Sequence, residues 1–211
     1  MAGLFITLEG GEGAGKSTQA KLLGEALSVR GHRVLLTREP GGAPGAERIR
    51  KLLVETAPNS SWDGVTEALL HTAARRDHLA QTVWPALAAG QVVISDRFAD
   101  STMAYQGYAH GVDRAALAGL YKAAVGDFKP RLTLILDLPV AAGLARAAQR
   151  GGLENRYESL GADFHERVRR GFHEIAKAEP ARCKVIDATR GIDAIHRDVV
   201  AEVLLVLGPA P

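Results

Sequence analysis

The chain has 211 residues, 46% of them hydrophobic, which is enough for one domain, residues 1–211, with a well-buried core. A formal net charge of +2 does not require a nucleic-acid-binding face, and Asp137 and Glu202 interrupt the longest apolar runs, so we expect neither a nucleic-acid partner nor a membrane span. The single cysteine, Cys183, excludes an intramolecular disulfide, and Met1 is not followed by a signal-peptide pattern, so we expect a cytoplasmic protein.

Short β-rich apolar runs alternate with longer helical patterns along the whole chain. The runs predict strands at residues 4–9, 33–37, 91–95, 132–138 and 184–187. The patterns between them predict helices at residues 17–29, 45–55, 65–89, 114–125, 140–149, 162–178 and 192–207. This alternation predicts a three-layer α/β fold, in which helices flank a five-stranded parallel sheet.

A glycine-rich segment at 10–17 directly follows the first predicted strand and matches the G-x-x-x-x-G-K-[ST] pattern of P-loop NTPases. Its glycines let successive backbone N–H groups turn toward phosphate oxygens, and the next helix directs its positive dipole end at the same point. Lys16 then reaches the β- and γ-phosphates, and the Ser17 hydroxyl binds Mg²⁺. We expect the donor nucleotide at Gly10, Gly11, Glu12, Gly13, Ala14, Gly15, Lys16, Ser17 and Thr18.

A P-loop alone is compatible with switch GTPases, motor ATPases and small-molecule kinases. A GTPase normally carries an Asn-Lys-x-Asp guanine-reading motif, but neither Asn59 nor Asn155 is followed by Lys. A motor ATPase needs a longer chain and further domains. The sequence therefore favours a compact kinase, in which donor and acceptor meet over the P-loop.

Polar clusters follow the second and third predicted strands, where open α/β sheets bind their ligands. They are Thr-Arg-Glu-Pro-Gly-Gly at 37–42, Asp-Arg-Phe at 96–98, Ser-Thr at 101–102 and Tyr-Gln-Gly at 105–107. Together with the P-loop they resemble the thymidylate kinase family, and the resemblance runs from about residue 4 to residue 189. It implies a homodimeric, Mg²⁺-dependent enzyme with the P-loop NTPase fold, which transfers the γ-phosphoryl group of ATP to dTMP.

The resemblance also implies roles for single residues at the acceptor. Arg38 holds the acceptor phosphate, and Arg97 neutralises charge during transfer while Asp96 supports the Mg²⁺ ion. Arg75 reads the thymine edge, and Tyr105 lies against the deoxyribose. The remaining acceptor contacts are expected from Glu12, Ser101, Thr102 and Gln106. No catalytic base is expected, because a phosphate monoester with a second pKa near 6 is already ionised at neutral pH.

The P-loop has no basic residue at its variable positions, so positive charge must reach the transferring phosphoryl group from elsewhere. A segment at about 146–160 resembles the lid of bacterial-type members, and it offers Arg146, Arg150 and Arg156. We expect Arg150 and Arg156 to be catalytic and Arg146 to bind ATP. Asp187 begins a loop after the last strand that resembles the one beside adenine in this family.

One position departs from the family pattern. The family usually places Phe four residues before the base-reading arginine, and this chain has His71 there. We expect His71 to pack on the acceptor base and, by taking up a proton near pH 6.5, to make dTMP affinity depend on pH. This departure leaves open a kinase for dUMP or a deoxynucleoside. A nucleotide-binding regulator without turnover is a second alternative.

Overall fold

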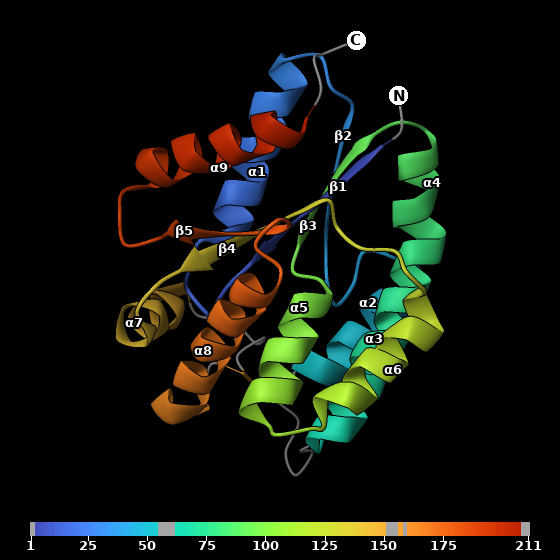
Figure 1. Ribbon diagram of the computed structural model, residues 1–211, viewed down its shortest axis with the longest axis vertical. Coiled ribbons are helices and arrows are strands. Elements are labelled where there is room, and N and C mark those ends of the chain that lie inside the picture. The colour runs from blue at the N-terminus through green and yellow to red at the C-terminus, as the bar shows by residue number, and fades with distance from the viewer. Residues whose placement is uncertain (1–2, 55–61, 151–155, 158–159, 208–211) are drawn as a thin grey trace.

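The computed structural model describes residues 3–54, 62–150, 156–157 and 160–207. Its five strands are β1 (Leu4–Glu9), β2 (Val34–Arg38), β3 (Val92–Asp96), β4 (Leu132–Asp137) and β5 (Cys183–Asp187). They form one parallel sheet in the order β2-β3-β1-β4-β5 (Figure 1). The sequence-based strand predictions are confirmed to within one residue at each end.

The helices of the described residues connect these strands. They are α1 (Lys16–Val29), α2 (Pro44–Val54), α3 (Gly64–His78), η1 (Leu79–Val83), α4 (Trp84–Ala88), α5 (Ala99–Thr102), η2 (Met103–Ala109), α6 (Arg114–Val125), α7 (Val140–Arg150), α8 (Ala162–Ala178) and α9 (Ile192–Val206). All seven predicted helices have a counterpart, although the last residue predicted for the second one, 55, lies outside the described residues.

Two helical regions differ from the expectation. The long helix predicted at 65–89 is continuous but contains the π-helical turn η1, next to Pro85, whose missing N–H removes one α-helical hydrogen bond. Residues 99–109, expected as loop, form the short helix α5 and the π-helical segment η2. Because Gly107 and the β-branched Thr102 weaken a helical pattern, the sequence did not indicate these turns.

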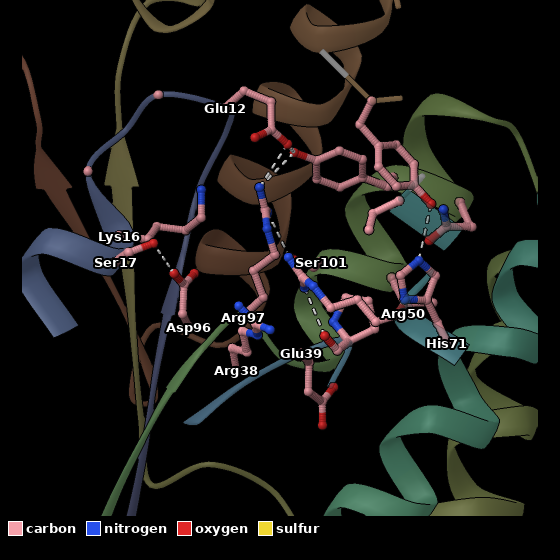
Figure 2. Close-up of a pocket in the computed structure, with 18 of the residues that line it drawn as sticks. Glu12, Lys16, Ser17, Arg38, Glu39, Arg50, His71, Asp96, Arg97 and Ser101 are labelled. Atoms are coloured by element: carbon pink, nitrogen blue, oxygen red, sulfur yellow. Dashed lines mark hydrogen bonds and ion pairs between the residues drawn. The ribbon is translucent and has the colours of Figure 1, made fainter. Parts of the chain in front are cut away.

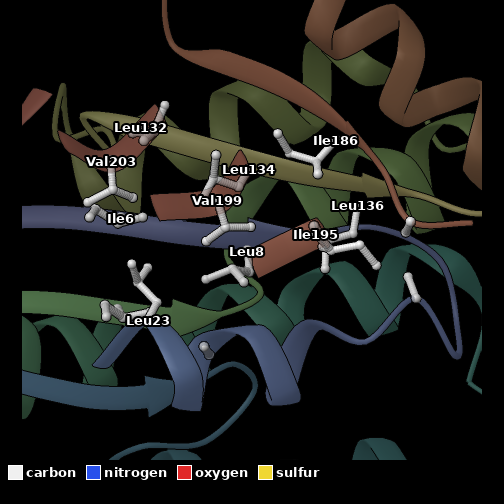
Figure 3. Packing of buried hydrophobic residues seen from close by; sticks show 14 of the residues in the cluster. Ile6, Leu8, Leu23, Leu132, Leu134, Leu136, Ile186, Ile195, Val199 and Val203 are labelled. Atoms are coloured by element: carbon white, nitrogen blue, oxygen red, sulfur yellow. The ribbon is translucent and has the colours of Figure 1, made fainter. Parts of the chain in front are cut away.

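The sheet is covered on both faces. Alternate residues of β1 point to opposite sides, so Ile6 and Leu8 pack with α1 and α9, whereas Phe5 packs with η1 and the end of α6. Figure 3 shows the first of these clusters, in which Leu23 of α1 and Val199 of α9 meet the strands. The opposite face carries α8, α5 and α6 (Figure 1). The predicted three-layer fold is thus confirmed.

Parallel pairing brings the carboxyl ends of three strands to one edge of the sheet. Asp96 at the end of β3 lies beside Leu8 of β1 and beside Arg38 of β2. The P-loop and the polar clusters that follow β2 and β3 therefore converge at this edge. None of the helices in the described ranges combines the length and apolar character that a membrane span requires.

Candidate active site

A cavity of about 400 Å³ opens at this edge of the sheet. In Figure 2, Lys16, Ser17 and Asp96 lie at one end, His71 lies at the other, and Arg97 stands between them. The predicted site residues that line the cavity are Glu12, Gly13, Gly15, Lys16, Ser17, Thr18, Arg38, His71, Asp96, Arg97, Ser101, Thr102, Tyr105 and Gln106. Those that do not line it are Gly10, Gly11, Ala14, Arg75, Arg146, Arg156 and Asp187.

The P-loop needs glycine at several positions. Gly13 has φ +68°, and a Cβ atom there would lie 2.1 Å from the carbonyl oxygen of Gly143 in α7. A Cβ atom on Gly143 would in turn lie 2.4 Å from the carbonyl oxygen of Glu12. The loop and α7 therefore touch backbone to backbone.

Lys16 folds back over the loop. Its Nζ atom donates to the carbonyl oxygens of Gly10 at 3.1 Å and Gly11 at 2.7 Å. Burial and then the charge of Arg97 lower the pKa of Lys16 to about 8, although the charge of Glu12 raises it. The ammonium group is thus poorly hydrated, which strengthens its attraction to an arriving phosphate.

Ser17 and Asp96 form the part of the site that suits a metal ion. The Ser17 hydroxyl donates a hydrogen bond to the Asp96 carboxylate at the mouth of the P-loop. Mg²⁺ is usually held by one or two protein oxygens together with phosphate oxygens and water, and a hydroxyl beside a carboxylate fits that pattern. Within the described residues there is no cluster of three or more His, Cys, Asp or Glu residues that could hold a metal by itself.

Arg97 stands at the centre of the cavity. Among the described non-glycine residues it alone has a positive φ, +70°. Its guanidinium donates to the Gly10 carbonyl at 3.1 Å, Ser101 Oγ at 3.1 Å, Glu12 Oε1 at 2.9 Å and the Tyr105 hydroxyl at 3.2 Å. Each of these partners comes from the P-loop or from the helical turns 99–109. Arg97 therefore connects the end of the cavity at the P-loop, called the donor end below, with the end toward His71, called the acceptor end.

Glu12 is the carboxylate of the P-loop. It pairs with Arg97 and also accepts from the Tyr105 hydroxyl at 2.8 Å. Burial alone would raise the pKa of Glu12, but Arg97 and Lys16 lower it to about 2. Glu12 is therefore ionised at every physiological pH, and it is turned away from the loop interior where the phosphates are expected.

The acceptor end begins at Arg38, whose side chain is 51% exposed and pairs with Glu47 of α2 at 3.1 Å. Arg75 lies behind the cavity wall, almost fully buried, where Nε donates to Glu39 Oε2 at 2.8 Å and Nη2 to Thr102 Oγ1 at 3.0 Å. The structure thus gives Arg75 two firm partners. Its contact with a thymine edge stays a prediction.

His71 points into the acceptor end, where its Nε2 and the Tyr157 hydroxyl are 3.2 Å apart. Burial, followed by the positive charges of Arg75 and Arg97, lowers the pKa of His71 to about 3. The expected protonation near pH 6.5 is therefore wrong: the imidazole is neutral over the physiological range. A neutral imidazole presents an aromatic face to the cavity.

Glu67 is a buried carboxylate that the sequence analysis missed. It accepts from Gln106 Nε2 at 2.7 Å, Arg156 Nη2 at 2.5 Å and the Tyr157 hydroxyl at 3.2 Å. Its position four residues before His71 puts both side chains on one face of α3, and that spacing was the available signal. Glu67 and Tyr157 thus belong to the acceptor end.

The residues predicted in the lid lie in different places. Arg146 of α7 donates to the Ala188 carbonyl at 3.4 Å, next to Asp187. Arg156 is held at the acceptor end by Glu67, and it also donates to the carbonyl of Leu53 at 3.0 Å. Arg150 is the last residue of α7, and its side chain is outside the described part. Residues 151–155 and 158–159 of the predicted lid segment also lie outside it.

Comparison with known proteins gives a consistent family. The family model described as Thymidylate kinase matches residues 8–199. A thymidylate kinase of Caulobacter vibrioides is 53% identical over 206 residues, covering 98% of both chains, and one of Gluconobacter oxydans is 54% identical over 195 residues, covering 92% of this chain and 90% of the relative. The crystal structure of thymidylate kinase from Ehrlichia chaffeensis is 36% identical, with a TM-score of 0.78 over 96% of this chain and 99% of that one. The chain therefore belongs to the thymidylate kinase family.

Proposed function

We propose that this chain transfers the γ-phosphoryl group of ATP to dTMP, which yields ADP and dTDP. One observation carries the proposal: a single cavity is lined by the P-loop at one end and by Arg38 and the aromatic ring of His71 toward the other. The separation suits two nucleotides that meet phosphate to phosphate. Membership of the thymidylate kinase family favours this reaction over a different acceptor or a silent regulator.

At the donor end, the P-loop amides and Lys16 bind the triphosphate of ATP. Ser17 and Asp96 would hold Mg²⁺, which, when bound, neutralises charge on the β- and γ-phosphate oxygens. Asp187 is the last residue of β5, and Arg146 donates to the carbonyl of the next residue, so we assign both to the adenosine side of the donor. The triphosphate is thereby fixed with its last phosphorus facing the acceptor end.

At the acceptor end, Arg38 binds the phosphate of dTMP, and its exposed guanidinium can leave Glu47 to do so. His71 stacks on the base as a neutral ring, while Gln106 and Thr102 offer polar contacts. Tyr105 lies under the sugar, where its hydroxyl is already held by Glu12 and Arg97. Arg75 would complete base recognition from behind Thr102.

Transfer itself depends on position and charge rather than on a base. The acceptor phosphate oxygen is already ionised at neutral pH and attacks in line with the leaving ADP oxygen. Arg97 lies between the two ends, and Lys16 lies beside the donor phosphates, so both stabilise the charge of the transferring group. We assign further positive charge to Arg150 and Arg156 of the lid segment, which move toward ATP when it binds.

We further propose a homodimer. Leu52 of α2 and Val65 and Leu69 of α3 are each at least half exposed, and two neighbouring helices that show apolar side chains suit a second copy. Sedimentation equilibrium of the chain and of Leu69→Glu tests this, since the substitution should shift the population to monomer. The cytoplasmic location expected from the cysteine content stays a prediction.

The reaction is tested by following ADP formation with ATP and Mg²⁺ in the presence of dTMP, dUMP, UMP, AMP or thymidine. We expect turnover with dTMP far above that with the other acceptors. Preferred use of thymidine would show a nucleoside kinase instead. No ADP with any of the five would show a regulator without turnover.

A further inference from the structure

Glu9 is a buried acidic residue to which none of the roles above has been assigned. It is the last residue of β1, directly before the P-loop, and its exposed fraction is 0%. By the alternation of the strand its side chain lies on the same face as Phe5 and Thr7, below the turn that carries Arg97. It takes part in none of the ion pairs among the described residues. Burying a carboxyl group costs free energy of desolvation, which its hydrogen bonds must offset.

The two oxygens of Glu9 contact two residues that follow Arg97 in the chain. The backbone N–H of Phe98 donates to Oε1 at 2.8 Å, and Oε2 lies 2.6 Å from Ser101 Oγ. Arg97, which directly precedes Phe98 in the sequence, has the left-handed φ of +70°, which an arginine adopts only when its neighbours hold it. Glu9 therefore fixes one side of that turn.

The rest of the turn is fixed as well. The N–H of Arg97 donates to the Leu8 carbonyl at 2.9 Å, and the Ser95 hydroxyl donates to the Arg97 carbonyl at 2.7 Å. With Phe98 N–H on Glu9, three successive backbone groups are held. The guanidinium of Arg97 then reaches Ser101 Oγ at 3.1 Å, so Ser101 touches both Arg97 and Glu9.

The direction of the hydrogen bond between Glu9 and Ser101 decides what Ser101 can do. An ionised Glu9 would accept the hydroxyl proton of Ser101 and turn it away from the cavity. A neutral Glu9 instead donates its own proton to Ser101 Oγ. Because Ser101 Oγ can accept from Glu9 and Arg97 together, its own proton is then free to reach a phosphate oxygen in the cavity that it lines.

The charged and titratable groups around Glu9 favour the neutral form. Burial, and then the charge of Asp100 on α5, raise the pKa of Glu9 to about 8, although the hydrogen bond with Ser101, the charge of Arg97 and the hydrogen bond from Phe98 lower it. Lys16 of α1 and the Cys183 thiol of β5 also face it. The polyphosphate of a bound nucleotide would add negative charge above Glu9 and favour its neutral form further.

We propose that Glu9 is a positioning residue that acts as a neutral carboxylic acid, donating to Ser101 while it accepts from Phe98, and so holds Arg97 and Ser101 for phosphoryl transfer. This role rests on the proposed function. Glu9 does not line the cavity in which the nucleotides would bind. Its effect is on the rate of transfer rather than on the binding of dTMP.

Three variants test the role in single-turnover measurements of dTDP formation. Glu9→Gln keeps an acceptor for Phe98 and a donor for Ser101, so its rate at pH 7 should stay within about threefold of the wild type. Glu9→Ala removes both contacts, and its rate should fall about 10- to 100-fold while KM for dTMP changes little. Thr7→Val is the matched control, because Thr7 is equally buried on the same face of β1 and bonds only to Thr133. It should lose stability but not rate.

The pH profile separates positioning from a merely structural role. Below pH 8 wild-type Glu9 is neutral, and above it Glu9 ionises, so the ratio of the Glu9→Gln rate to the wild-type rate should rise as pH goes from about 7 to about 9. Ionisation of the dTMP phosphate affects both proteins alike and cancels in the ratio. The charge of Glu9 also raises the pKa of Lys16, and this effect persists without Ser101, so a Ser101→Ala background separates it from the effect that passes through Ser101. In that background the rise of the ratio with pH should be smaller.

The proposal is overturned if Glu9→Ala transfers phosphate as fast as Thr7→Val. It is also overturned if the ratio of the Glu9→Gln rate to the wild-type rate does not change with pH. A Glu9→Gln rate as low as that of Glu9→Ala would show that the ionised carboxylate, not the acid, is required, which also overturns it. If Glu9→Ala does not fold, the Glu9→Gln ratio still decides. A wild-type protein without dTMP activity would overturn the proposed function instead.

Discussion

The donor and acceptor ends of the cavity are built in different ways. The donor end is mostly backbone from the single segment 10–17, which is fixed by glycine torsion angles and by Lys16 folded onto its own loop. The acceptor end is mostly side chains. They come from β2, α3, α5, η2 and the residues after α7, represented by Arg38, His71, Thr102, Gln106 and Tyr157.

This difference determines how each end tolerates change. A site made of backbone groups depends on a few torsion angles, so it requires glycine and appears in the sequence as a continuous motif. A site made of side chains from separate elements can exchange one ring for another, as His71 does for the family's usual Phe. We therefore expect the largest effects at the donor end and progressively smaller ones toward His71.

Loss of the Lys16 charge should have the largest effect. Lys16→Met keeps the apolar stem of the side chain but removes the ammonium group beside the phosphates, so we expect kcat/KM to fall by about a thousandfold. The assay is ADP formation with saturating dTMP. Lys21→Met, an exposed lysine on the same helix, is the control and should be unchanged. A loss below about tenfold would contradict a donor site centred on Lys16.

Arg38→Ala should act on the acceptor alone. It removes an exposed guanidinium that we assign to the dTMP phosphate, so KM for dTMP should rise by about 10- to 100-fold while KM for ATP stays nearly constant. Steady-state kinetics with each substrate varied in turn measures both constants. Arg48→Ala, which removes an exposed arginine of α2, should change neither. An equal rise in both constants would place Arg38 between the two ends instead.

Glu67→Gln should weaken the acceptor end and the fold together. The carboxylate of Glu67 pairs with Arg156 and is 1% exposed, so its neutral amide leaves a buried guanidinium less well compensated. We expect the free energy of unfolding to fall by about 3 kcal/mol, measured by urea denaturation. The exposed Glu166→Gln should lose less than about 0.5 kcal/mol. A Glu67 variant as stable as this control would show that the cluster contributes little.

His71→Phe should have the smallest effect on activity. With a pKa of about 3, His71 is neutral from about pH 5.5 to about pH 8, so the KM for dTMP should follow the same pH profile in both proteins. Divergent profiles would show that His71 takes up a proton in the complex.

The same substitution should change acid stability. Unfolded His71 binds a proton below about pH 6.5 but folded His71 does not, so the wild type loses stability as pH falls through that value. The free energy of unfolding of His71→Phe relative to that of the wild type should therefore be about 2 kcal/mol larger at about pH 5 than at about pH 7. Urea denaturation at both pH values measures the difference.

The parts of the molecule that could be predicted from sequence are those whose signal is local. The strands were predictable because each is a short run of mostly apolar residues, and the P-loop because its glycines all lie within the one short segment 10–17. Glu67 was missed because Tyr157 lies 90 residues away along the chain, so no local pattern joins them. The burial of Arg75 was missed for the same reason, since its partner Glu39 follows β2, 36 residues earlier in the chain. Residue roles carried over from the family stay predictions.

The close approach of Gly13 and Gly143 has a mechanical consequence. The two backbones pack directly against each other, with no flexible side chain between them, so the phosphate loop and the first turn of α7 should move as one rigid unit. A triphosphate that shifts the loop must also tilt this helix, which carries Arg146 toward the loop beside β5. Arrival of the donor and the position of Arg146 are thereby coupled, and even a methyl group at either glycine would force the two backbones apart.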